Sequence, residues 1–238
     1  MKINTHKPVS ATYLVFSMLG LALLAVLFFS IPSAYADALQ SRLFGFSFIL
    51  ICVLGALAGV YPSKCLGKGS EVEDYLPGKM HSKDEAEASV AFRGHHPTCT
   101  SYSSHVIHLR GESYCAGCSG LAFGALVSAL GTALYLLFSI HLDEVSTPIF
   151  WLGSAGVALG LLQYHLGADT ASIHFLLNVL FVLGAFLILI SVLGKGSTLL
   201  GFYFLGVLLY WIATRIVLSK TGHERTCNDC EKPCSQRF

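Results

Sequence analysis

The sequence predicts an all-α integral membrane protein: six transmembrane helices, with a small cytosolic Cys/His-rich metal-binding insertion between helices 2 and 3. Three observations lead to this prediction. The 238 residues are 54% hydrophobic and only 12% charged, whereas a soluble domain carries about 25% charged residues. The apolar residues fall into separate runs, each close to the roughly 20 residues that a span needs. Cysteines and histidines gather directly before the third run.

The apolar runs define the expected helices in order. None of them contains an internal Asp, Glu or Lys. Arg215 lies within a turn of the end of the sixth run, where its long side chain can snorkel to the membrane interface. The predicted spans cover residues 9–31, 43–61, 120–140, 149–165, 172–193 and 199–218.

The first run has two interpretations. Lys2 and Lys7 precede it, and residues 33–37 resemble the Ala-x-Ala cleavage site of a secretory signal peptide. A signal-peptide core has about 7–15 residues, and this run is longer, so a retained signal anchor is favoured. The other spans are the same in either case.

Basic residues set the expected orientation. With the N-terminus inside, all but Arg42 and Lys195 of the 15 Lys and Arg residues fall on the inner side, as the positive-inside rule requires. We therefore expect a multi-pass protein of the cell membrane with cytosolic N- and C-termini. Its partners are the lipid bilayer and, as an open alternative, a second copy or another membrane protein. The net charge of +1 gives no sign of nucleic-acid binding.

Four regions follow from this reading: helices 1–2 in residues 1–62, a cytosolic loop in 63–119, helices 3–6 in 120–219 and a cytosolic Cys-rich tail in 220–238. The loop begins as a flexible linker and ends in the Cys/His motif. Within that motif, residues 105–109 favour a short strand, residues 110–113 a turn, and Tyr114 and Cys115 the start of a return strand.

The loop motif is typical of a metal site. Cys99, Cys115 and Cys118 supply three thiolates, and the two-residue gap in Cys-x-x-Cys lets two sulfurs bind one ion. Zinc takes four Cys or His ligands. His105 is the favoured fourth ligand, and His96 and Cys65 are the alternatives. The site could also be a zinc staple that folds the loop and does nothing else.

The tail contains a second cluster with ligand spacing. It could hold its own metal or join the loop cysteines. An iron–sulfur cluster is less favoured, because the tail lacks a typical ferredoxin run. The residues of this cluster are His223, Cys227, Cys230 and Cys234.

Two enzymatic alternatives stay open. Cys115 and Cys118 lie near a helix N-terminus, which stabilises thiolate, so they could exchange disulfides. The charge bias places them on the reducing side, which favours metal. Alternatively, His165, Asp169 and His174 flank the turn between spans 4 and 5 and could form a metal-dependent hydrolase site. They could also be ordinary interfacial residues.

Small residues recur at helix-packing spacing in two spans. Gly120 and Gly124 open the third span, and Gly156 and Gly160 lie in the fourth. Such pairs predict close helix contacts in lipid.

The loop motif also carries a resemblance. His95-His96-Pro97-x-Cys99, with Cys115-Ala116-Gly117-Cys118-Ser119-Gly120, resembles a motif of uncharacterised prokaryotic, mainly archaeal, multi-span membrane proteins. In that family Thr usually stands where this chain has Ser119. The family has no established activity, so the resemblance implies a shared cysteine site and no reaction.

Overall fold

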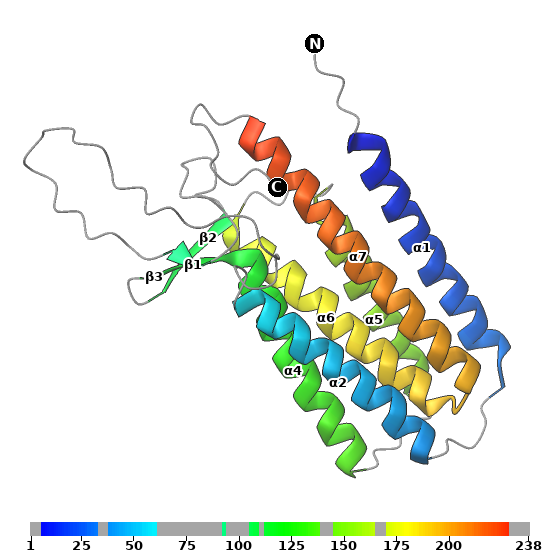
Figure 1. Ribbon diagram of the computed structural model, residues 1–238. Coiled ribbons are helices and arrows are strands. Elements are labelled where there is room, and N and C mark those ends of the chain that lie inside the picture. The colour runs from blue at the N-terminus through cyan, green and yellow to red at the C-terminus, as the bar shows by residue number, and fades with distance from the viewer. Residues whose placement is uncertain are drawn as a thin grey trace, which may run out of the picture.

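The computed structural model of the chain describes residues 6–32, 38–60, 92–93, 105–109, 112–138, 145–164 and 170–228 (Figure 1). Its helices are α1 (His6–Ser30), α2 (Ala38–Val60), α4 (Ala116–Phe138), α5 (Ser146–Leu162), α6 (Ala171–Gly194) and α7 (Thr198–Asn228). Its strands are β1 (Phe92–Arg93), β2 (Val106–Leu109) and β3 (Glu112–Cys115). Apart from this small sheet, the described part of the chain has the predicted all-α character.

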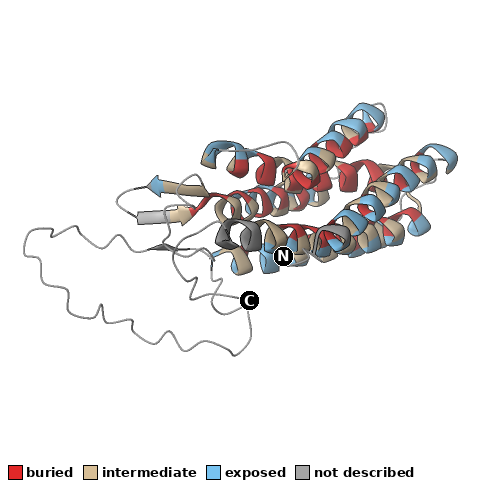
Figure 2. Ribbon diagram, turned by 90° about the horizontal axis from the view of Figure 1, so that it is seen from above, coloured by how far each residue is buried: buried red, intermediate tan, exposed pale blue. Residues whose placement is uncertain are grey.

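The outer faces of the helices are apolar. Five helices, all except α5, are long and apolar enough to cross a membrane, whereas α5 has 17 residues. Large apolar side chains stand exposed on these faces, among them Phe16, Leu126 and Leu152. Figure 2 shows buried residues on the inward sides of the helices and exposed residues on the outward sides. An exposed apolar surface of this extent is typical of contact with lipid.

α6 is the central helix of the bundle. It packs against α4 and α5 and also touches α2 and α7. In its most apolar stretch, 67% of the residues are buried, against 17% in the peripheral α1. A helix that is apolar on all sides belongs in such a central position, because every face then meets another helix.

Glycines let α4 and α5 approach α6 closely. A Cβ atom added at Gly156 of α5 would lie 2.7 Å from the carbonyl oxygen of Leu180, closer than real Cβ atoms come. One added at Gly124 of α4 would lie 3.2 Å from the Cα atom of Val179. Both glycine motifs that the sequence singles out are therefore confirmed as helix-packing positions.

Successive helices run in opposite directions, so half of the helix ends lie at the end of the bundle from which the β-strands project (Figure 1). We call this the hairpin end. It holds the first residues of α1, α4 and α6 and the last residues of α2, α5 and α7. Arg42 and Lys195, the two basic residues expected on the outer side, lie near the opposite end, at the start of α2 and just after α6.

The β2–β3 hairpin contains both predicted strands, but β3 begins at Glu112, inside the segment expected as a turn. Residues 110 and 111 lie outside the described residues. The two strands pair antiparallel, with Val106 opposite Cys115, and β1 pairs with β3 in parallel. α4 follows β3 directly and begins at Ala116, four residues before the expected span. α7 continues to Asn228, into the region expected as a tail. Both differences arise because apolarity locates the membrane-buried part of a helix, while backbone hydrogen bonding extends into polar sequence.

Replacing Gly156 by Ala tests the packing of α5 on α6. The added methyl group meets the backbone of α6, so we expect a loss of about 1–3 kcal/mol of stability. This corresponds to a Tm lower by roughly 3–10 °C, measured by thermal unfolding in detergent.

Gly55→Ala is the matched control, because nothing lies within 4 Å of a Cβ atom at that position in α2. We expect its Tm to be unchanged or higher. Equal losses for both variants would contradict the packing described for α5 and α6.

Candidate functional site

The Cys-x-x-Cys motif spans a junction between a strand and a helix. Cys115 is the last residue of β3, and Cys118 lies in the first turn of α4. Cys115 is 2% exposed, and Cys118 is half-buried. The unpaired N–H groups of a helix N-terminus favour negative charge, so this position stabilises thiolate sulfur.

This cysteine turn packs between two other helices. A Cβ atom at Gly117 would lie 3.6 Å from Asn178 Nδ2 on α6 and 4.0 Å from Cys115 Sγ. On the other side, a Cβ atom at Gly59 near the end of α2 would lie 3.0 Å from the carbonyl oxygen of Cys118. The backbone of the motif is therefore held against both helices.

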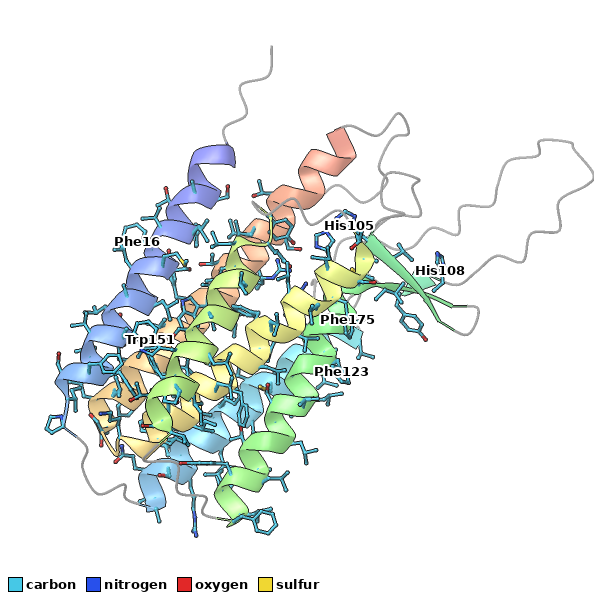
Figure 3. The ribbon with its side chains drawn as sticks, turned by 180° about the vertical axis from the view of Figure 1, so that it is seen from behind. Phe16, His105, His108, Phe123, Trp151 and Phe175 are labelled. Carbon is cyan, nitrogen blue, oxygen red and sulfur yellow. The ribbon has the colours of Figure 1, made fainter. Side chains whose placement is uncertain are left out.

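The two histidines at the hairpin, His105 and His108, have different surroundings. His105 directly precedes β2, and its ring stacks on the ring of His174 in α6, with centroids 4.4 Å apart and an interplanar angle of 30°. His174 is 6% exposed. His108 is exposed and lies farther out along the hairpin (Figure 3). Of these two loop histidines, only His105 reaches the helix bundle through this contact.

A buried polar cluster lies beside His174. Arg215 of α7 is 6% exposed. Its Nε atom donates to Asn178 Oδ1 at 3.1 Å, its Nη2 atom donates to the same oxygen, and its Nη1 atom donates to Tyr164 Oη at 2.9 Å. The expected snorkelling of Arg215 to the interface is therefore wrong, because its guanidinium turns inward to partners on α6 and at the end of α5.

Three further contacts complete the cluster. Asn178 Nδ2 donates to the carbonyl oxygen of His174 at 2.6 Å. Gln163 is fully buried beside the same guanidinium, and with its amide oxygen facing the cation that oxygen lies 2.8 Å from Arg215 Nη1. This orientation places an acceptor against a cation. The Tyr164 ring also lies 5.0 Å from the guanidinium carbon of Arg215. We call Gln163, Tyr164, Asn178 and Arg215 the arginine cluster.

The predicted metal ligands are only partly described. Among the residues whose side chains the structure describes, no three from His, Cys, Asp and Glu come close enough to hold a metal ion. His105, Cys115 and Cys118 lie at the hairpin end, and His223 and Cys227 lie in the last turns of α7. The other predicted ligands lie outside the described residues: Cys65, His96, Cys99, Cys230 and Cys234.

The hydrolase alternative is also only partly described. His174 lies in the first turn of α6, where it stacks with His105. His165 and Asp169 lie outside the described residues. Whether these three side chains converge therefore stays a prediction.

The arginine cluster is the part of the site that the sequence reasoning missed. The signal was present, since Asn178 and Gln163 are amides inside or beside apolar runs. Polar groups in such runs tend to face a partner within the bundle. Which partner they meet depends on how the helices are rotated, and hydropathy does not report that rotation.

Comparisons with known proteins leave the family of this chain open. No family model, no curated protein and no solved structure matches it. The resemblance of the Cys/His motif to prokaryotic membrane proteins therefore stays a prediction.

Proposed function

We propose that this chain is a six-span protein of the cell membrane whose cytosolic face forms a binding site stabilised by zinc. Cys99, His105, Cys115 and Cys118 would hold the ion. The observation that carries this proposal is the position of the Cys-x-x-Cys motif, which joins the end of β3 to the first turn of α4. An ion bound there would tie the hairpin to the bundle.

The chemistry of the donors supports zinc. Thiolate and imidazole are the ligands that tetrahedral zinc prefers. The register of the hairpin supports His105 as a ligand, because Val106 pairs with Cys115 and His105 is the next residue along. Its ring would have to turn from His174 toward the sulfurs on binding. Cys99, outside the described residues, would complete the set.

The size of the sheet gives a physical reason for the metal. β1 has two residues, and β2 and β3 have four each. A sheet this small buries little apolar surface and is marginal alone in water. A structural zinc site contributes folding free energy directly, so an ion at this junction would stabilise the hairpin.

The disulfide-exchange alternative is less well supported. Exchange requires access to the attacked or attacking sulfur, and Cys115 is 2% exposed. The half-buried Cys118 keeps this alternative open. The side of the membrane on which the motif lies separates it from the zinc proposal, because stable disulfides form in oxidising compartments.

Metal analysis of the purified protein tests the zinc proposal. We expect about one zinc ion per chain at the loop site. Cys115→Ser and Cys118→Ser should each lower the zinc content strongly, because the three proposed sulfur ligands are then reduced to two. Elemental analysis against protein concentration measures the ratio.

Cys52→Ser is the matched control, because Cys52 is buried in α2, away from the hairpin end. It should keep the zinc content of the unmodified protein. Full zinc in both loop variants would rule the proposed ligands out.

Labelling with a membrane-impermeant maleimide tests the orientation. In a cysteine-free background, Lys195→Cys should react in intact cells, because Lys195 lies at the end opposite the hairpin. A background that keeps only Cys118 should react only after the membrane is permeabilised. The reverse pattern would place the hairpin outside and favour disulfide exchange over zinc binding.

A further inference from the structure

We infer that the hairpin end binds an oxyanion, a phosphate or carboxylate group, at the arginine cluster. This site goes beyond the proposed zinc function and does not require a metal at Cys115 and Cys118. It rests on one buried cation and on the neutral groups that surround it.

The charge of Arg215 lacks a counter-charge in the described part of the chain. A guanidinium stays protonated in proteins, and this one is 6% exposed. Its hydrogen-bond acceptors within the described ranges are the amide of Asn178 and the hydroxyl of Tyr164, with the Gln163 amide alongside. All three groups are neutral. Burying a charge without an opposite charge is costly, so the cluster favours a bound anion.

Arg215 does not act as an interfacial anchor. α7 continues to Asn228, so Arg215 lies about 20 Å before the end of the helix at 1.5 Å per residue. An arginine that only anchors a helix extends its head group toward water. Here the head group turns inward, where it bonds to Asn178 on α6 and to Tyr164 after α5.

Hydrogen bonds within the arginine cluster hold the guanidinium of Arg215 in one orientation. Asn178 Nδ2 donates to the carbonyl oxygen of His174, which fixes the amide so that Oδ1 faces Arg215 Nε and Nη2. One edge of the guanidinium is thereby held in place. A planar guanidinium in a fixed orientation suits the geometry of phosphate and carboxylate.

Tyr164 offers a second donor to the same anion. Its hydroxyl oxygen accepts from Arg215 Nη1, so its own O–H can donate to an oxyanion beside the guanidinium. Tyr164 is half-buried at the end of α5, on the side where the hairpin lies. The ring of His174 is 6.5 Å from the Tyr164 ring, centroid to centroid.

The anion has two sources with the same chemistry. A lipid phosphate could enter from the bilayer, since α7, which carries Arg215, is one of the helices long and apolar enough to cross a membrane. A free phosphate or a soluble carboxylate could enter from the aqueous side at the hairpin end.

Binding measurements on the full-length protein test this inference. The Tm in neutral detergent is measured against inorganic phosphate at constant ionic strength, and then in phosphatidylcholine nanodiscs with and without phosphatidylglycerol. We expect a saturable rise in Tm of roughly 3 °C or more. A rise with phosphate points to a soluble ligand, and a rise with phosphatidylglycerol alone points to lipid.

Variants assign the effect to the cluster. Arg215→Gln should abolish the rise. Arg215→Lys and Tyr164→Phe should each weaken binding about tenfold, since each loses one charge-assisted hydrogen bond. If Arg215→Gln does not fold, these two variants still test whether the cluster binds the anion. Lys220→Gln is the control, because Lys220 is an exposed basic residue on the same helix, and it should keep the full rise.

Three results would overturn the inference. The first is the absence of a saturable rise in Tm with either source. The second is a rise that Lys220→Gln removes as completely as Arg215→Gln. The third is a rise that appears only in Asp169→Asn, because that carboxylate would then be the counter-charge of Arg215 in the unmodified protein.

Discussion

The close approach of the first turn of α4 to α6 is the contact on which the hairpin end depends. Gly117 lies against Asn178. At Gly120, a Cβ atom would overlap the carbonyl oxygen of Phe175, so no side chain fits there. Because α4 continues directly from β3, this helix contact also fixes where the hairpin leaves the bundle. The cysteine turn and the arginine cluster therefore occupy neighbouring positions.

This arrangement places two kinds of chemistry side by side. The thiols of Cys115 and Cys118 lie at a helix N-terminus, where soft metal ligands are stabilised. The guanidinium of Arg215 lies in the neighbouring arginine cluster, where it donates to the neutral side chains of Asn178 and Tyr164. The stacked rings of His105 and His174 connect the hairpin to the helix that carries Asn178.

Hydropathy predicted the helices well because α1, α2, α4, α6 and α7 have to be apolar over the thickness of a bilayer. The two strands of the hairpin were expected from their residues, whereas the predicted turn extended two residues into β3.

The inward turn of Arg215 could not be predicted in this way. A basic residue near the end of an apolar run can reach either water or a buried partner, and the choice depends on Asn178 and Tyr164 in other helices. The start of α4 was also misplaced, because the Cys-Ala-Gly-Cys-Ser sequence is polar enough to resemble a loop although its backbone is helical from Ala116.

The central claim is that the junction of β3 and α4 binds zinc through sulfur. X-ray absorption spectroscopy at the zinc edge of the purified protein tests this claim most directly. The account predicts a four-coordinate ion with mainly sulfur ligands at about 2.3 Å and at least one nitrogen at about 2.0–2.1 Å. A shell of oxygen and nitrogen alone would contradict it, since Cys115 and Cys118 would then not be ligands.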